Sequence, residues 1–249
     1  MSRVLVITGV AGGIGKATAE VFRERGWNVI GVDIQPAEYL EQKGDFVLAD
    51  VSDSAGWEKV VAKILEKQGQ VDALVNNAAI QICRPLVETT PEEWDKVMAV
   101  NLRSVYLGVR HIYPLMEKAG GAVVNVSSVH AIATSTNIAV YATTKGGVLA
   151  LTRALAIELA PSQIRVNAVL PGAVDTPMLE AGLSRGHLPG ESVTELLQQL
   201  GHKHVIGRIG QPREIAEGIY FLADGDRSSF MTGQNLVIDG GATARLSTE

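Results

Sequence analysis

The sequence predicts an α/β domain with a doubly wound, mostly parallel sheet of seven strands and helices on both faces. Short apolar runs rich in β-branched residues alternate with longer stretches of helical periodicity along all 249 residues. Most of the short runs are apolar throughout, which is typical of parallel strands that are covered on both faces. No internal repeat or low-complexity linker interrupts the alternation. Residues 1–249 are therefore expected to form a single domain.

The elements are expected in a regular order along the chain. Strands are expected at 4–7, 29–32, 46–48, 73–75, 122–126, 165–169 and 236–238. Helices are expected at 14–25, 55–68, 91–118, 141–159 and 212–223. Pro91 followed by two glutamates indicates a helix start, with Thr90 as its N-cap. Crossovers between parallel strands are nearly always right-handed, so this order predicts helices on both faces of one sheet.

Residues 179–206 depart from this pattern. Glycines and histidines interrupt it at Gly182, Gly186, Gly190 and Gly201 and at His187, His202 and His204. We expect a partly helical surface insertion, placed as a candidate lid over a site, with its histidines in solvent.

Composition and charge exclude several classes of protein. The chain has 22 Lys+Arg against 27 Asp+Glu, a net charge of −5, and no basic cluster, which argues against nucleic-acid binding. A single cysteine, Cys83, and no recognisable signal peptide indicate a soluble protein of the reducing cytoplasm. No stretch has the composition of a membrane helix. No His-Glu-x-x-His or paired-cysteine motif is present, so no metal is expected.

A glycine-rich turn follows the first strand. Its expected cofactor contacts are Gly9, Gly12, Gly13, Ile14 and Gly15. Glycines at a strand-to-helix turn let backbone N–H groups approach a pyrophosphate at the helix N-terminus. An ordinary glycine-rich turn is the alternative interpretation.

An acidic residue at the end of the second expected strand favours a dinucleotide. Asp33 lies 20 residues after Gly13, where a carboxylate can bind the ribose hydroxyls of the adenosine half. Neither Gly12 nor Ile34 supplies a cation for a 2′-phosphate, so NAD is predicted rather than NADP. Asp50 and Val51 follow the third strand as candidate adenine contacts, although a turn-forming Asp50 is about equally favoured.

Tyr141 and Lys145 are the candidate proton-transfer pair. Four residues apart on one helix, they share a face. A nearby ammonium and a cationic nicotinamide should lower the pKa of the tyrosine. The rate of alcohol oxidation should then rise with pH through an apparent pKa well below that of a free tyrosine. Tyr39 and Lys43 form a second pair at this spacing. They lie among charged residues, and we interpret them as a surface pair without a catalytic role.

Ser128 supplies the context that distinguishes the first pair. It lies 13 residues before Tyr141, directly after the fifth expected strand. The carboxyl ends of parallel strands are where open α/β sheets bind ligands. Its hydroxyl can hold a substrate oxygen as charge develops, whereas Ser127 is expected to satisfy loop backbone.

With these motifs together, the whole chain resembles the short-chain dehydrogenase/reductase family, which has a Rossmann-type fold. The Thr-Gly-Val-Ala-Gly-Gly-Ile-Gly run at 8–15 is similar to its cofactor loop, and Asn-Asn-Ala-Ala at 76–79 to its strand-four motif, in which Ala79 replaces the usual glycine. Gly-Arg at 207–208 and Asp-Gly-Gly at 239–241 are similar to its C-terminal signatures.

The resemblance implies roles for individual residues. It implies an acid/base at Tyr141, a substrate-positioning hydroxyl at Ser128, a lysine at 145 that binds nicotinamide ribose, and a relay water held by Asn101. The further cofactor contacts implied are Asn77, Ala78, Pro171, Gly172, Val174 and Thr176. It also implies a homotetramer, with the helices at 91–118 and 141–159 as interfaces.

The sequence therefore predicts an NAD-dependent oxidoreductase that interconverts a small-molecule secondary alcohol and a ketone. The residues expected to face the substrate are Gln81, Ser128, His130, Thr136, Asn137 and Tyr141. Their polarity favours a polyol, a sugar or a hydroxy acid. Gln81 and His130 resemble carboxylate-binding positions of 3-hydroxybutyrate dehydrogenases, but Ile138 stands where those enzymes have lysine, and Arg84 is expected at the surface. The alternative function is a non-catalytic, NAD(H)-sensing binding protein on the same fold.

Overall fold

The computed structural model describes residues 2–41, 45–67, 69–183 and 192–244. It contains a seven-stranded sheet in the order β3-β2-β1-β4-β5-β6-β7, in which every neighbouring pair is parallel. The strands are β1 Val4–Thr8, β2 Asn28–Asp33, β3 Phe46–Leu48, β4 Ala73–Asn76, β5 Gly121–Val126, β6 Ile164–Pro171 and β7 Asn235–Ile238. The predicted fold class is confirmed, and each expected strand lies within an observed one.

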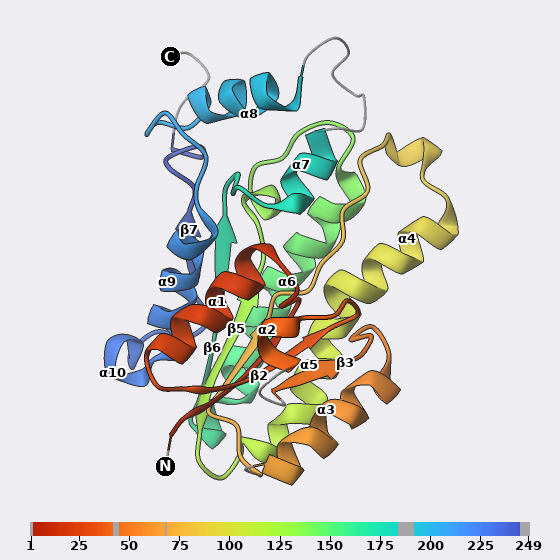
Figure 1. Cartoon of the computed structure of the whole chain (residues 1–249). Helices are drawn as coiled ribbons and strands as arrows, with labels where there is room; N and C mark the ends of the chain where they lie inside the picture. Colours follow the sequence, from red (N-terminus) through yellow and green to blue (C-terminus); the bar gives the residue numbers. More distant parts are fainter. Residues whose placement is uncertain (1, 42–44, 68, 184–191, 245–249) are drawn as a thin grey trace.

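The order of the strands reverses beside β1. The chain moves outward from β1 through β2 to β3, then returns to place β4 on the other side of β1 and continues to β7 (Figure 1). In open α/β sheets the crevice at the carboxyl ends of the strands at such a reversal is the preferred ligand site. The glycine-rich turn follows β1 at this crevice.

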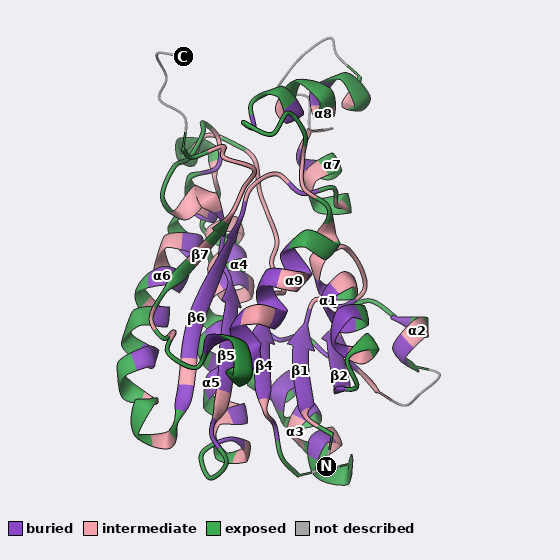
Figure 2. Cartoon of the chain, turned by 90° about the vertical axis from the view of Figure 1, so that its left-hand side faces the viewer, coloured by how far each residue is buried: buried purple, intermediate pink, exposed green. Residues whose placement is uncertain are grey.

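Helices pack against both faces of the sheet. They are α1 Gly13–Glu24, α2 Glu38–Glu41, α3 Ser54–Lys67, α4 Pro91–Met98, α5 Ser104–Ile112, α6 Ala139–Glu158, α7 Pro177–Leu183, α8 Val193–His202, α9 Pro212–Ala223 and α10 Gly225–Ser228. Side chains of α1 and α9, among them Phe22 and Ile215, form the apolar core on one face. Side chains of α3, α5 and α6, among them Trp57 and Ile112, form the core on the other. The five inner strands are buried over most of their length, whereas the edge strands β3 and β7 are partly exposed (Figure 2).

The helix expected at 91–118 is several elements rather than one. Thr90 caps α4 with a full capping box, as expected. A π-helical segment, Ala99–Arg103, then separates α4 from α5, and a 3-10 turn, Tyr113–Leu115, ends the helical stretch. Other 3-10 turns lie at Leu86–Glu88, Val129–Ala131 and Ala160–Ser162. A π segment inside a helix often marks a functional position, and here it contains Asn101.

The segment at 179–206 is partly helical in its described residues, as expected, but the two described glycines do not break the helices. Gly182 lies within α7 and Gly201 within α8, and both are buried. Ser192 starts α8 with a capping box to Glu195. Gly186, His187 and Gly190 lie outside the described residues. Within the described ranges, no helix has the length and apolar composition to cross a membrane.

Candidate active site

The glycine-rich turn has the geometry of a phosphate cradle. Gly9 and Gly13 adopt φ of 74° and 52°, in the left-handed region that favours glycine. A Cβ on Gly15 would lie 1.9 Å from the carbonyl oxygen of Gly9, so the helix can approach β1 only with glycine at this position. Gly12 caps α1 without a side-chain hydrogen bond, and no described heavy atom lies within 4 Å of a Cβ built on it. The open helix N-terminus therefore fits an anionic pyrophosphate.

Asp33 and Tyr39 hold this turn from the side of β2. The Asp33 carboxylate accepts hydrogen bonds from the backbone N–H of Ala11, at 2.8 Å, and of Gln35, at 3.0 Å. The Tyr39 hydroxyl donates to the carbonyl oxygen of Val10 at 3.0 Å. The expectation of a surface tyrosine is therefore wrong: Tyr39 is half-buried and bonded to the cofactor loop. Lys43 lies outside the described residues.

Asn77 fixes the turn from the side of β4. Its amide donates to the carbonyl oxygens of Thr8, at 2.9 Å, and Gly9, at 3.1 Å. The Thr8 hydroxyl in return accepts from the N–H groups of Asn77 and Ala78, each at 3.0 Å. The side chain of Asn77 thus supports the cofactor loop through the protein backbone.

Asp50 and Val51 are engaged within the chain after β3. Asp50 accepts from the N–H of Ser52 at 2.8 Å, which is the turn geometry weighed as the alternative. Val51 is buried, and its carbonyl oxygen accepts from the Trp57 indole at 2.9 Å.

Ser128, Tyr141 and Lys145 meet at the carboxyl end of β5. Ser128 directly follows this strand as the N-cap of the turn Val129–Ala131, and the other two lie one turn apart in α6. The Ser128 hydroxyl lies close enough to the Tyr141 hydroxyl to lower its pKa, and it accepts a hydrogen bond from the N–H of His130 at 3.2 Å. The Lys145 Nζ donates to the carbonyl oxygen of Val126 at 2.8 Å and lies 5.4 Å from the centroid of the Tyr141 ring. Ser127 donates to the Lys145 carbonyl oxygen, as a structural serine would.

Asn101 is buried in the π-helical segment between α4 and α5. Its amide group accepts from the N–H of Ile80 at 2.8 Å, and it donates to the carbonyl oxygen of Ile80 at 2.9 Å and to the Thr144 hydroxyl at 3.2 Å. The side chain therefore ties the segment after β4 to α6, one residue away from Lys145.

The segment after β6 closes over the cofactor loop. β6 ends at Pro171, and Gly172 packs so closely on β7 that a Cβ would lie 2.8 Å from the Asp239 Cα. Val174 forms a parallel bridge with Gly210. The Thr176 methyl group lies 3.1 Å from the Cβ position of Gly13, so this segment and the glycine-rich turn are neighbours.

Of the residues expected to face the substrate, His130 lies beside Tyr141 and Gln81 lies beside α7. The His130 ring lies edge-on to the Tyr141 ring, 5.9 Å between centroids, and its Nδ1 is bonded to the Thr134 hydroxyl at 3.1 Å. Gln81 donates to the Cys83 sulfur at 3.0 Å and lies 3.5 Å from the Cβ position of Gly182 in α7. Asn137, with a left-handed φ of 62°, precedes the buried Ile138.

The sequence predicted the exposure of Arg84 correctly and that of His204 wrongly. Arg84 is paired with Glu93 at 3.0 Å on the surface, as expected. His204 is 4% exposed, so the expectation that it is solvated is wrong; His202 is exposed. Two hydrogen bonds from the His204 ring to backbone groups explain why this histidine is buried.

Comparisons with known proteins place this arrangement in a family. The family model described as enoyl-(acyl carrier protein) reductase matches residues 9–243. The chain is 41% identical over 249 residues to the 3-oxoacyl-(acyl carrier protein) reductase FabG of Thermotoga maritima, with 96% of this chain and 97% of that protein covered. The chain belongs to the short-chain dehydrogenase/reductase family.

Solved structures of the family superpose on nearly the whole chain. The aldohexose dehydrogenase of Thermoplasma acidophilum matches with a TM-score of 0.90 and 33% identity, covering 99% of this chain and 96% of that one. The 3-ketoacyl-(acyl carrier protein) reductase of Brucella melitensis, solved in complex with NADH, matches with a TM-score of 0.87 and 34% identity, covering 97% and 98%. This short-chain dehydrogenase/reductase is therefore an oxidoreductase.

Burial determines the ionisation of the central pair in this short-chain dehydrogenase/reductase. It raises the pKa of Tyr141 to about 12. The nearby Ser128 hydroxyl lowers this pKa, but its effect is smaller than that of burial. Burial also lowers the pKa of Lys145 to about 8 and lowers that of His130. In the chain by itself the loss of water around the phenolate outweighs its neighbours. The lowered tyrosine pKa expected with a cationic nicotinamide bound stays a prediction. Among the described residues, no group of three or more His, Cys, Asp and Glu side chains could hold a metal ion.

Proposed function

We propose that the protein transfers a hydride between NAD(H) and the secondary alcohol or ketone of a polar small molecule: a polyol, a sugar or a hydroxy acid. The observation that carries this proposal is the meeting of Ser128, Tyr141 and Lys145 beside the glycine-rich turn at the carboxyl edge of the sheet. The polar side chains of Gln81 and His130 at the rim support a polar substrate. The similarity to an aldohexose dehydrogenase is in keeping with this class.

The proton-transfer roles follow from the positions of the side chains. A bound nicotinamide supplies the acceptor or donor of the hydride. Tyr141 takes the hydroxyl proton from the alcohol during oxidation and returns it to the ketone oxygen during reduction. Ser128 donates a hydrogen bond to the same oxygen and holds it at Tyr141. The Lys145 ammonium beside the ring favours the phenolate, and Asn101 keeps the segment after β4 in place against α6.

We propose NAD rather than NADP as the cofactor. The Asp33 carboxylate at the end of β2 would repel a 2′-phosphate, and its neighbour Ile34 is 64% exposed without a charge to compensate. The match to a family structure in complex with NADH supports this choice.

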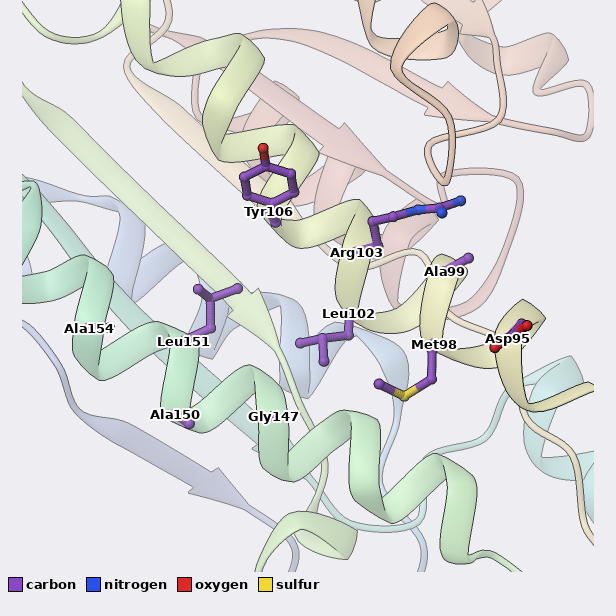
Figure 3. A pocket seen from close by; sticks show the side chains of 10 residues that line it. All are labelled: Asp95, Met98, Ala99, Leu102, Arg103, Tyr106, Gly147, Ala150, Leu151 and Ala154. Atoms are coloured by element: carbon purple, nitrogen blue, oxygen red, sulfur yellow. The ribbon is translucent and has the colours of Figure 1, made fainter. Parts of the chain in front are cut away.

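We propose a homotetramer. The helices α4 and α5 on one side and α6 on the other border an open hollow of about 840 Å³, shown in Figure 3. Apolar side chains of Met98, Leu102 and Leu151 line it, as expected for helices that pack against a second copy. Val237 in the edge strand β7 and Phe230, in the segment before that strand, are also exposed.

A substrate screen tests the proposed reaction. Purified protein is mixed with NAD and a panel of polyols, sugars and hydroxy acids, with a 3-oxoacyl thioester and NADH as a separate arm, and the absorbance of NADH is followed. Turnover of a polar alcohol is expected. Turnover confined to the thioester would refute the substrate class, and NADH binding without turnover of any compound would favour the sensing alternative. Light scattering tests the assembly, since a monomer mass at working concentration would refute the tetramer.

A further inference from the structure

His204 is a buried histidine in an otherwise exposed turn. It follows α8, between the exposed Lys203 and Val205, yet only 4% of its surface is exposed. A polar ring buried without partners would be destabilising, so each ring nitrogen must have a hydrogen bond. Both have one, and both partners are backbone groups.

The two bonds indicate which ring nitrogen carries the hydrogen in the neutral ring. The Nδ1 lies 2.8 Å from the carbonyl oxygen of Leu200, which can only accept, so Nδ1 carries the hydrogen. In the neutral ring Nε2 then has a lone pair, and it accepts from the N–H of Ala173 at 3.4 Å. His204 thus joins the last turn of α8 to the segment that follows β6.

Ala173 lies at the centre of the segment that closes over the cofactor loop. The N–H of its neighbour Gly172 donates to the carbonyl oxygen of Ile238 at 3.0 Å, and the Ala173 carbonyl accepts from Gly210 at 2.8 Å. Three residues further on, Thr176 contacts the Gly13 position. Backbone bonds therefore fix this segment to β7 and to the Gly210 loop, and the His204 side chain fixes it to α8.

We infer that His204 is a positioning residue for the nicotinamide, which it places by fastening Ala173 to helix α8. This inference rests on the proposed function, in which the segment 171–176 contacts the nicotinamide. Because α8 contacts α7, which packs beside Gln81, the same bond connects the substrate side of the crevice to the cofactor side. Through this connection His204 holds the substrate side and the cofactor side of the crevice at a fixed position relative to each other when both ligands are bound.

Two conservative variants separate the two bonds. In His204→Asn the side chain ends near the position of Nδ1 and can keep the bond to Leu200, but it is too short for Ala173. In His204→Gln the longer side chain can place its oxygen at the position of Nε2 and keep the bond to Ala173. The matched control is His202→Asn, the same substitution two residues earlier at an exposed position of α8.

NADH binding is measured directly for each protein by fluorescence titration, with thermal unfolding as a readout of the fold. We expect His204→Asn to weaken NADH binding roughly twofold to tenfold, the range for one hydrogen bond. We expect His204→Gln and His202→Asn to stay within about twofold of wild type, which is less than one such bond contributes. The KM for NAD should rise in the same order wherever the screen has found a substrate.

The outcomes distinguish this inference from the proposed function. Wild-type NADH binding in His204→Asn would overturn the inference alone. So would equal losses in His204→Asn and His204→Gln that follow their melting temperatures, since the role of His204 would then be structural. Wild-type protein that binds neither NADH nor NADPH would overturn the proposed function together with this inference.

Discussion

Replacing Tyr141 with phenylalanine should abolish turnover while leaving the fold nearly intact. The substitution keeps the buried ring and removes a hydroxyl that interacts with the nearby Ser128 hydroxyl. Losing an interaction no stronger than one hydrogen bond lowers the free energy of unfolding by at most about 0.5–1.5 kcal/mol. Losing the general acid/base lowers kcat by roughly 10²–10⁴, which corresponds to about 3–5 kcal/mol in the activation free energy. The effect on the rate should therefore far exceed the effect on stability.

The raised pKa of Tyr141 makes the two directions of the reaction differ. With a pKa of about 12, the phenol of the chain by itself is protonated throughout the neutral range and ready to donate to a ketone oxygen. Oxidation needs the phenolate, so its rate should rise with pH, through an apparent pKa that binding of the cationic cofactor has lowered. A 295 nm difference titration of wild type against Tyr141→Phe should show no extra tyrosine ionising below pH 10 before the cofactor is added.

Tyr113→Phe is the matched control. Its hydroxyl is bonded to a serine hydroxyl, that of Ser162 at 3.0 Å, and it lies at the opposite end of the sheet from the crevice, near the start of β4. Steady-state kinetics should show near wild-type kcat for this control. If Tyr141→Phe retained more than about a tenth of the wild-type kcat on a substrate limited by chemistry, its role as acid/base would be refuted.

Three further substitutions test the surroundings of the site. Asp33→Ala should shift the ratio of kcat/KM for NADP over NAD upward by about tenfold, because a like charge no longer faces the 2′-phosphate; an unchanged ratio would contradict the role of Asp33. Tyr39→Phe should raise the KM for NAD roughly twofold to tenfold at constant kcat, because the Val10 carbonyl loses its donor; an unchanged KM would show that this bond does not support cofactor binding. Ser128→Ala removes the hydroxyl that lowers the pKa of Tyr141, so the pH profile of oxidation should move to higher pH. An unchanged profile or a shift to lower pH would show that Ser128 does not lower this pKa.

The sequence predicted the sheet well because buried parallel strands leave a plain pattern. Val4 to Ile7 are apolar on both faces, and only Asn125 interrupts the apolar run from Ala122 to Val126, which is typical of strands covered on both faces. The π segment at Ala99–Arg103 could not be predicted, because it continues the helical periodicity on either side. The buried Gly182 and Gly201 misled in a similar way: glycine lowers helix propensity, but close packing can require it.

The candidate site was predictable where chemistry restricts the residue type and less so where backbone contacts decide. The spacing of Ser128, Tyr141 and Lys145 placed them at one strand end, and the structure brings them together. Tyr39 and His204 each act on a backbone group far along the chain, Val10 and Ala173. No local pattern indicates such a partner. The direction of the pKa shift of Tyr141 likewise depends on burial, which spacing does not report.

Lys145 offers a last test, in which function and stability should move in opposite directions. Burial lowers its pKa from 10.5 to about 8, so holding the ammonium in the folded protein at pH 7 is unfavourable by about 3 kcal/mol. Lys145→Met removes this penalty and leaves the Val126 carbonyl without its donor, which costs about 1–3 kcal/mol. The free energy of unfolding at pH 7 should therefore stay equal to that of wild type or rise by up to about 2 kcal/mol, while turnover and NAD affinity fall.

The sign of the pH dependence makes this prediction specific. Between pH 8 and 10.5 the unfolded wild-type chain binds more protons at this lysine than the folded one, so wild-type stability gains about 3 kcal/mol over that interval. Lys145→Met lacks this gain, and every other titrating group is common to both proteins. Urea unfolding at pH 7 and pH 10 should show the variant losing its advantage at the higher pH. Parallel pH dependences in the two proteins would mean that Lys145 is not held as a buried ammonium, and its proposed electrostatic role beside Tyr141 would fail.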